Sequence, residues 1–246
     1  MTYAKYSASG NDFIIAQAIK TADRRDLARA LCDRQNGIGA DGFILLKPHD
    51  KLDFEWEFYN SDGSRAEMCG NGARAAAHFA FYNEIAGENM RFLTLAGEIS
   101  AKVEGDFVSV GLGGFTIEPR AIDDAGKKWR FVNTGVPHIV SQTGDLAAFD
   151  TLPLAKLRAK YNANVNLFAQ KDGALFVRTF ERGVEGETLA CGTGMAACFA
   201  AALAEKIVEN PAKIYPKSGE EIRLELVGDS LMLSGKVKKV FDAVLS

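Results

Sequence analysis

The feature that most constrains the fold of this chain is an internal duplication. Three short segments recur in the same order: SGNDFII at 9–15 resembles TGVPHIV at 134–140, CGNG at 69–72 resembles CGTG at 191–194, and AGE at 96–98 resembles SGE at 218–220. Each second copy follows the first by about 122–125 residues, and similarity at one spacing indicates a repeated structural unit. We predict two similar units, residues 1–114 and 115–238, with residues 239–246 as a C-terminal strand that can return to the first unit. The stretch 113–128, rich in turn formers and charges, is the expected boundary.

Composition narrows the class of protein. The chain has 246 residues, of which 47% are hydrophobic and 25% charged, so it can bury a core without disulfides or metals. A net charge of -3 offers no basic excess for nucleic acid or an anionic membrane. The sequence shows neither a signal peptide nor an apolar run of about 20 residues, and four cysteines do not make a disulfide scaffold. We therefore expect a cytoplasmic protein with reduced thiols.

Periodicity predicts that each unit is mostly strand, with one prominent helix. Alanine-rich runs follow both CGxG motifs and predict helices over about 71–85 and 193–207; alanine favours helix and suits a helix surrounded by strands. Further helices are expected at 22–34 and 154–161, and strands at 42–47, 54–59, 91–95, 107–112, 174–180, 222–227 and 231–237. The predicted fold class is α+β: two pseudo-symmetric units, each a bent mixed sheet or barrel wrapped around a central helix.

The two repeated cysteines are the strongest candidates for chemistry. Cys69 and Cys191 each stand between a polar turn and a predicted helix. The free N–H groups and partial positive charge of a helix N-terminus bind carboxylates and favour a thiolate. If two such sites face one substrate carboxylate, one thiolate can remove the α-proton and the opposite thiol can return a proton from the other side. The N–H donors would stabilise the negative charge that develops. This scheme needs no pyridoxal phosphate and no metal.

Each thiol also needs a partner that orients it. His138 lies in a duplicated segment and Glu181 lies ten residues before Cys191, so we hypothesise that His138 pairs with Cys69 and Glu181 with Cys191. Arg182 follows in the same turn, where it either binds a substrate carboxylate bidentately or is simply exposed. On the residues alone, the roles of Asn11, Asn60 and Asn164 stay open.

Other motifs are interpreted as structural. GIGADG at 37–42 matches the dinucleotide fingerprint G-x-G-x-x-G, but a predicted helix precedes it and a strand follows, the reverse of the required order. Cys32 and Cys198 lack a glycine context and are expected to be buried packing residues. The histidine and cysteine spacings do not suggest zinc.

The motifs SGNDF, GIGADG, YNSDGSRAEMCGNG, TGVPH, FERGVEGETLACGTG and YPKSGEEI together resemble diaminopimelate epimerases, in the family's order and over nearly the whole chain. The resemblance implies interconversion of LL- and meso-diaminopimelate for lysine and peptidoglycan synthesis, without pyridoxal phosphate or metal, by two pseudo-symmetric domains that commonly form homodimers. It implies that Cys69 and Cys191 are the bases and that His138 and Glu181 support them.

The resemblance also assigns the substrate-binding residues. Gly70, Asn71, Gly192 and Thr193 match the carboxylate-binding helix ends, while Asn60, Asn164 and Arg182 match the residues that hold the distal end, with Asn11 lining the site. Two positions depart from the family pattern. Many members have glutamine where Gly42 stands and asparagine where Val136 stands. How tightly the distal carboxylate is bound in this protein therefore stays an open question at this point.

Three other functions compete with this one. A racemase of another amino acid could use the same scaffold. A thiol oxidoreductase could use Cys69 and Cys191 as a redox pair, although redox cysteines usually lie close together in sequence. A non-catalytic amino-acid-binding protein would bind its ligand without turnover. Proton exchange with solvent separates the epimerase from the last two.

Overall fold

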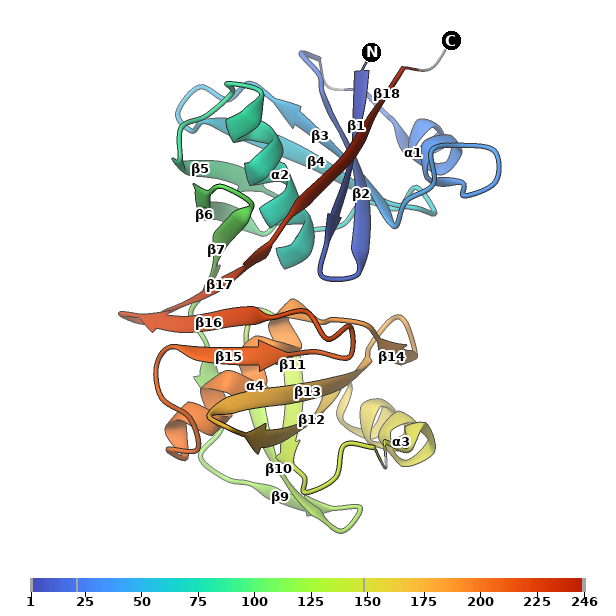
Figure 1. Ribbon diagram of the computed structural model, residues 1–246. Helices are drawn as coiled ribbons and strands as arrows, with labels where there is room; N and C mark the ends of the chain where they lie inside the picture. Colours follow the sequence, from blue (N-terminus) through green and yellow to red (C-terminus); the bar gives the residue numbers. More distant parts are fainter. Residues whose placement is uncertain (1, 21, 148, 245–246) are drawn as a thin grey trace. The chain divides into compact units, whose positions relative to one another are not determined.

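The computed structural model describes residues 2–20, 22–147 and 149–244. The chain forms two compact units: one contains the residues up to Val110 together with the segment from Gly235 onward, and the other spans Gly111–Ser234 (Figure 1). The stretch 113–128, near which the boundary was expected, contains two short strands, β8 (Thr116–Ile117) and β9 (Ile122–Asp124). Both pair with β10 (Lys127–Asn133), so this stretch is part of the second unit's sheet.

The first unit is built on a mixed sheet in which antiparallel and parallel pairings alternate. Its strands are β1 (Thr2–Ala8), β2 (Asn11–Gln17), β3 (Gly42–Lys47), β4 (Phe54–Asn60), β5 (Asn89–Thr94), β6 (Gly97–Glu104) and β7 (Phe107–Gly113). Pair β1–β2 is antiparallel, β2–β3 parallel, β3–β4 antiparallel, β4–β5 parallel and β5–β6 antiparallel. The two parallel pairs need long crossovers, and a helix lies in each: α1 (Arg25–Cys32) and α2 (Gly70–Tyr82).

The second unit repeats this succession of pairings. Its strands are β10, β11 (Pro137–Gln142), β12 (Asn164–Lys171), β13 (Ala174–Glu181), β14 (Gly186–Thr188), β15 (Ala212–Tyr215), β16 (Ile222–Val227) and β17 (Ser230–Lys236). Pair β10–β11 is antiparallel, β11–β12 parallel, β12–β13 antiparallel, β13–β15 parallel and β15–β16 antiparallel. Helices α3 (Thr151–Tyr161) and α4 (Gly192–Ala204) occupy the crossovers. The matching pairings confirm the pseudo-symmetry predicted from the duplicated motifs.

The first long strand of each unit pairs with an additional antiparallel strand. In the first unit, β18 (Lys238–Val244) pairs antiparallel with β1, from Thr2 opposite Val244 to Ser7 opposite Lys238. In the second unit, β8 pairs antiparallel with β10. Strand β8 follows β7, and β18 follows β17, so the two added strands are equivalent in the duplication.

The helices α2 and α4 are buried on every side, which explains their composition. In α2 all residues from Asn71 to Ala80 are buried, and in α4 all from Gly194 to Ala202. Helix α2 packs against β1, β2, β3 and β6, while α4 packs against β10 to β13 and β15 (Figure 1). A helix without an exposed face has no polar stripe, and alanine lets the surrounding strands approach closely. The predicted central helices are thus confirmed, each ending three residues earlier than expected.

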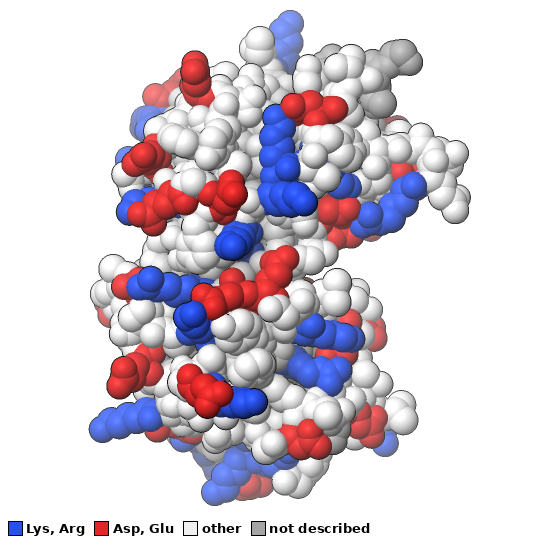
Figure 2. Space-filling model, viewed as in Figure 1, with Lys and Arg blue, Asp and Glu red and all other residues white. Residues whose placement is uncertain are grey.

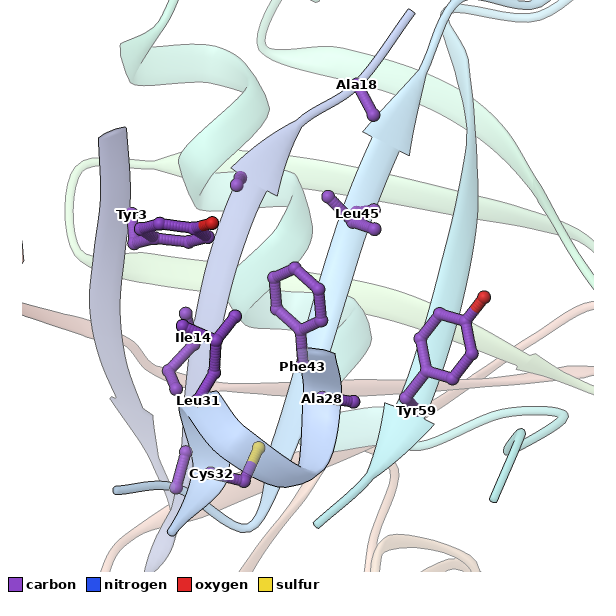
Figure 3. Packing of buried hydrophobic residues seen from close by; sticks show 11 residues of the cluster. Tyr3, Ile14, Ala18, Ala28, Leu31, Cys32, Phe43, Leu45 and Tyr59 are labelled. Atoms are coloured by element: carbon purple, nitrogen blue, oxygen red, sulfur yellow. The ribbon is translucent and has the colours of Figure 1, made fainter. Parts of the chain in front are cut away.

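The outer helices cover the opposite faces of the sheets. Phe43 and Leu45 of β3 pack with Leu31 of α1 (Figure 3), whereas Ile44 of the same strand lies near Gly72 of α2. In the second unit, Val165 and Leu167 of β12 pack in a cluster with Leu154 of α3. Strands covered on both faces are apolar throughout, as the fully buried pattern of β3 shows. Each unit therefore has three layers: an outer helix, a sheet and a central helix.

Charged side chains are dispersed over the surface. In Figure 2, acidic and basic side chains are interspersed on the visible face of both units. No helix in the described part of the chain is long and apolar enough to cross a membrane.

Candidate active site

Cys69 is the N-cap residue of α2. Its backbone is extended, and its Sγ accepts a hydrogen bond from the N–H of Gly72 at 3.5 Å. The thiol is half-buried, so it can reach a ligand. Gly70 and Asn71 open the helix, where backbone N–H groups have no partner within the helix itself. The structure thus places Cys69 directly beside the N–H groups predicted to bind a carboxylate.

A chain of side-chain hydrogen bonds fixes the start of α2. Arg74 is fully buried and donates to Asn71 Oδ1 at 2.6 Å and to Ser9 Oγ at 2.7 Å. Asn71 Nδ2 in turn donates to Asn11 Oδ1 at 2.7 Å, and Asn11 Nδ2 donates to Asp41 at 3.0 Å. The side chain of Asn71 is therefore engaged within the protein. Its backbone N–H is the group that suits a substrate.

Two further positions of the first unit stand at strand ends. Asn60 ends β4, opposite Gly42 in the register, and its Nδ2 donates to Ser64 Oγ at 3.0 Å. Gly42 departs from the family pattern for a packing reason. A Cβ at this position would lie only 2.5 Å from Cε2 of Phe58, so a glutamine would collide with that ring.

Cys191 is the N-cap residue of α4 and is buried, with 8% of its surface exposed. Its Sγ lies 3.5 Å from the Thr193 hydroxyl. The Glu181 carboxyl lies at the end of β13, beside this thiol and the Thr188 hydroxyl. Burial raises the pKa of Glu181, while the neighbouring Thr188 and Cys191 act in the opposite direction. The structure therefore brings Glu181 and Cys191 together, as the sequence had suggested.

His138 lies in β11 and is completely buried. Its Nδ1 is 3.1 Å from the side-chain nitrogen of Asn166, and its Nε2 has no hydrogen-bond partner among the described residues. The pKa of His138 is lowered to about 3, mainly by burial and also by the positive charge of Arg182. The imidazole is therefore neutral near pH 7.

Asn164 and Arg182 join two loops of the second unit. Asn164 is buried; its Oδ1 accepts a hydrogen bond from the backbone N–H of Arg182 at 2.8 Å, and its Nδ2 donates to the Pro137 carbonyl at 3.2 Å. The guanidinium of Arg182 donates to the Asn162 carbonyl at 3.1 Å and is half-buried. The Asn164 amide thus holds the loop before His138 against the loop after Glu181.

The candidate residues accordingly form one group in each unit. The first unit holds Cys69, Gly70, Asn71, Asn11 and Asn60; the second holds Cys191, Gly192, Thr193, His138, Glu181, Asn164 and Arg182. The hypothesised partnership of His138 with Cys69 joins residues of different units and stays a prediction.

Two cysteines lie outside these groups. Burial raises the pKa of the Cys32 thiol to about 12 and raises that of Cys198 well above its usual value. Both therefore stay protonated and apolar in character, which agrees with their interpretation as packing residues. The segment 37–42 connects α1 to β3, so the order of a dinucleotide-binding motif is absent there, as predicted.

The sequence interpretation missed three polar residues at these sites. Arg74 was hidden inside an alanine-rich helix, and Asn166 and Thr179 were hidden inside apolar strands. The strand pattern could have indicated Asn166, which lies two positions after Asn164, so that both face the same side of β12. Thr179 lies opposite Asn166 in the register of β12 and β13.

The burial of His138 has a consequence for stability. The unfolded chain binds a proton on His138 near its ordinary pKa of 6.5, whereas the folded protein resists protonation down to about pH 3. The stabilisation from the neutral imidazole is thus complete above pH 6.5 and is lost as pH falls toward 3. We expect the stability advantage of wild type over H138Q to shrink with acid, by at most about 1.4 kcal/mol per pH unit.

Urea unfolding of both proteins between pH 7 and pH 4 measures this difference. A constant difference across that range would contradict the inferred burial. Comparing the two proteins at each pH cancels the contribution of His78, whose pKa is also lowered by burial.

Sequence comparisons identify relatives over nearly the full length. The family model described as "Diaminopimelate epimerase" matches residues 3–117 and 130–240. A diaminopimelate epimerase from Campylobacter jejuni (strain 81-176) is 55% identical over 244 residues, covering 99% of this chain and 98% of that protein. One from Helicobacter pylori is 39% identical, covering 100% and 96% respectively.

Solved structures share the fold at low sequence identity. A PhzC/PhzF protein from Clostridium difficile superimposes with a TM-score of 0.78 at 13% identity, covering 100% of this chain and 99% of that one. A probable proline racemase from Agrobacterium radiobacter gives 0.75 at 14% identity, covering 100% and 92%. With these neighbours the predicted fold class is confirmed. From the family match and the close relatives, the chain belongs to the diaminopimelate epimerase family and is an isomerase.

Proposed function

We propose that this protein interconverts LL- and meso-diaminopimelate by moving one proton across the α-carbon, with Cys69 and Cys191 as the two bases. The observation that carries the proposal is that both cysteines are the N-cap residues of the central helix of their own unit, next to N–H groups that have no partner within the helix. The duplication therefore supplies two equivalent acid–base sites, and inversion of one carbon needs two. The relatives' names supply the substrate.

The proposed reaction requires the thiols to act on opposite faces of one carbon. One thiolate takes the α-proton and becomes a thiol, and the other thiol gives its proton to the opposite face and becomes a thiolate. The backbone N–H groups of Gly70, Asn71, Gly192 and Thr193 would bind the α-carboxylate and stabilise the charge that develops on it. We assign Arg182, Asn60, Asn164 and Asn11 to the rest of the substrate. The substrate is a small amino acid, and the scheme uses no cofactor.

Glu181 supports the role of Cys191. Its carboxyl lies beside the Cys191 thiol in a largely buried setting, and burial raises the pKa of this carboxyl, which makes it a better proton acceptor. We propose that Glu181 orients the thiol and receives its proton when Cys191 acts as the base. His138 would orient the thiol of Cys69.

Turnover in heavy water tests the proposal. With LL-diaminopimelate in deuterated buffer, we expect meso product with one deuterium at the inverted carbon, measured by mass spectrometry and proton NMR at low conversion. Because the acid and the base are different groups, recovered substrate should stay unlabelled. Unlabelled product, or equal labelling of substrate and product, would contradict two-base transfer.

A racemase of another amino acid is the alternative to separate from this function. Val136 stands where many family members carry asparagine, so the binding of a second substrate carboxylate needs a direct test. The same assay with proline and other single-centre amino acids provides it. Racemisation of those substrates without turnover of diaminopimelate would reassign the substrate while keeping the mechanism.

A further inference from the structure

The space beneath the first turn of the central helix is filled differently in the two units. In the first unit the residues there are apolar. A Cβ on Gly72 would lie 3.2 Å from Ile44 Cδ1 and 3.4 Å from Phe13 Cε1, and the rings of Phe13 and Phe58 are 6.0 Å apart with an edge-on geometry. Ile44 lies opposite Phe58 in the register of β3 and β4.

The same positions of the second unit carry polar side chains. His138 pairs with Asn164 across β11 and β12, as Phe13 pairs with Gly42 across β2 and β3. Asn166 lies opposite Thr179, as Ile44 lies opposite Phe58. A Cβ on Gly194 would lie 2.4 Å from Asn166 Oδ1 and 3.0 Å from Thr179 Oγ1. His138, Asn166 and Thr179 therefore replace Phe13, Ile44 and Phe58.

The first unit shows that this fold accepts an apolar core at these positions. His138 and Asn166 are fully buried and Thr179 is 3% exposed. Burial of a polar group destabilises a fold unless hydrogen bonds compensate it, and Nε2 of His138 has no hydrogen-bond partner among the described residues. Folding alone therefore does not account for the polar set, which points to a role in the reaction.

The surroundings of Asn166 determine the orientation of its amide. Nδ2 lies 3.1 Å from the Ile139 carbonyl and 3.4 Å from the Asn164 carbonyl, so this atom must be the donor. On the other side, the Thr179 hydroxyl donates to Oδ1 at 2.9 Å. A rotated amide would set its oxygen against two carbonyl oxygens and lose these hydrogen bonds.

This orientation also defines the protonation of the imidazole. The donor Nδ2 of Asn166 lies 3.1 Å from Nδ1 of His138, so Nδ1 accepts a hydrogen bond and cannot carry the proton. We propose that Asn166 is a positioning residue that holds neutral His138 in the tautomer with its proton on Nε2. The tautomer follows from the contacts themselves, whereas its use in catalysis rests on the proposed function.

A protonated Nε2 gives His138 a specific chemical task. Nε2 is buried and has no partner within the described protein, so its N–H is available to a group outside this cluster. An N–H donor stabilises a thiolate, the form of cysteine that removes a proton. Under the proposed function that thiolate is Cys69.

Nitrogen NMR on histidine-labelled protein tests the tautomer directly. The chain has three histidines, so the three imidazoles can be assigned with single substitutions. In wild type at pH 7.5 we expect one-bond proton coupling at His138 Nε2 and none at Nδ1. In N166D the carboxylate can only accept, so the proton should move to Nδ1. In T179V the amide loses its hydroxyl partner, and we expect a mixture of the two tautomers.

Kinetics give a second readout. N166D should lower kcat by about 10²-fold or more with a smaller change in KM, since the histidine becomes an acceptor where a donor is needed. The exposed Asn89 allows a matched control, because N89D makes the same chemical change in the other unit, at a residue outside the candidate site, and should leave the NMR pattern and the rates unchanged.

The outcomes separate the two proposals. A wild-type proton on Nδ1, or the same tautomer in wild type and N166D, would overturn the role of Asn166. If N166D fails to fold, T179V and the wild-type spectrum still decide the question. The expected tautomers without any turnover of diaminopimelate would uphold the positioning role and reject the proposed function instead.

Discussion

Epimerisation should fall by about 10²–10⁴-fold in C69A and in C191A, because each substitution removes one of the two groups that transfer the proton. A single remaining thiol can still exchange the proton on its own face. Each variant is therefore expected to wash deuterium into one stereoisomer without inverting it. Separate incubations with LL- and meso-diaminopimelate in heavy water would assign each thiol to one face.

The control for these variants is C32A. Cys32 is buried between α1 and the sheet of the first unit, and its raised pKa keeps it protonated, so its removal should affect packing only. We expect C32A to retain near-wild-type kcat. Full inversion by either C69A or C191A would rule out the two-base scheme. Equal losses of rate in all three variants would point to a folding defect.

G194A is expected to damage both stability and activity. The added methyl group would lie 2.4 Å from Asn166 Oδ1, at the centre of a buried hydrogen-bonded cluster that has little room to relax. Overpacking of this kind costs about 1–3 kcal/mol, of which the better helix propensity of alanine returns up to about 1 kcal/mol. Because the shift displaces Asn166, kcat should fall together with the urea midpoint.

The duplication supplies the control, G72A. There the methyl group would meet the end of the Ile44 side chain at 3.2 Å, and this flexible apolar contact can adjust by a few tenths of an ångström. Helix propensity should then compensate the strain, leaving the unfolding free energy within about 0.5 kcal/mol of wild type. If G72A destabilises the protein as much as G194A, the polar cluster is not the cause.

Much of the fold was predictable because it depends on local patterns. Strands such as β3 and β16 have the predicted bounds, since an apolar run in β3 and an alternation of apolar and charged residues in β16 leave few alternatives. The short strands β8 and β9 were missed, because their sequences resemble turns and their pairing with β10 is a tertiary contact.

The residues of the candidate site could be predicted where the two copies of the repeat match, and could not be predicted where the copies differ. Cys69 and Cys191 are conspicuous because the motif around them occurs twice. Asn166 escapes such a comparison, because Ile44 stands in its place in the first copy. In a duplicated chain, positions that match between the two copies therefore indicate the shared scaffold. Positions that differ indicate where the two units have different functions.

The pairing of β1 with β18 has a consequence for how the protein is made. Residues 2–7 are synthesised well before their neighbours, residues 238–244. Until residues 238–244 have been made, β1 therefore has an open strand edge, the kind of surface that recruits chaperones or aggregates. Completion of the first half of the chain is not enough to close this edge, because the strand that covers it follows the whole second unit.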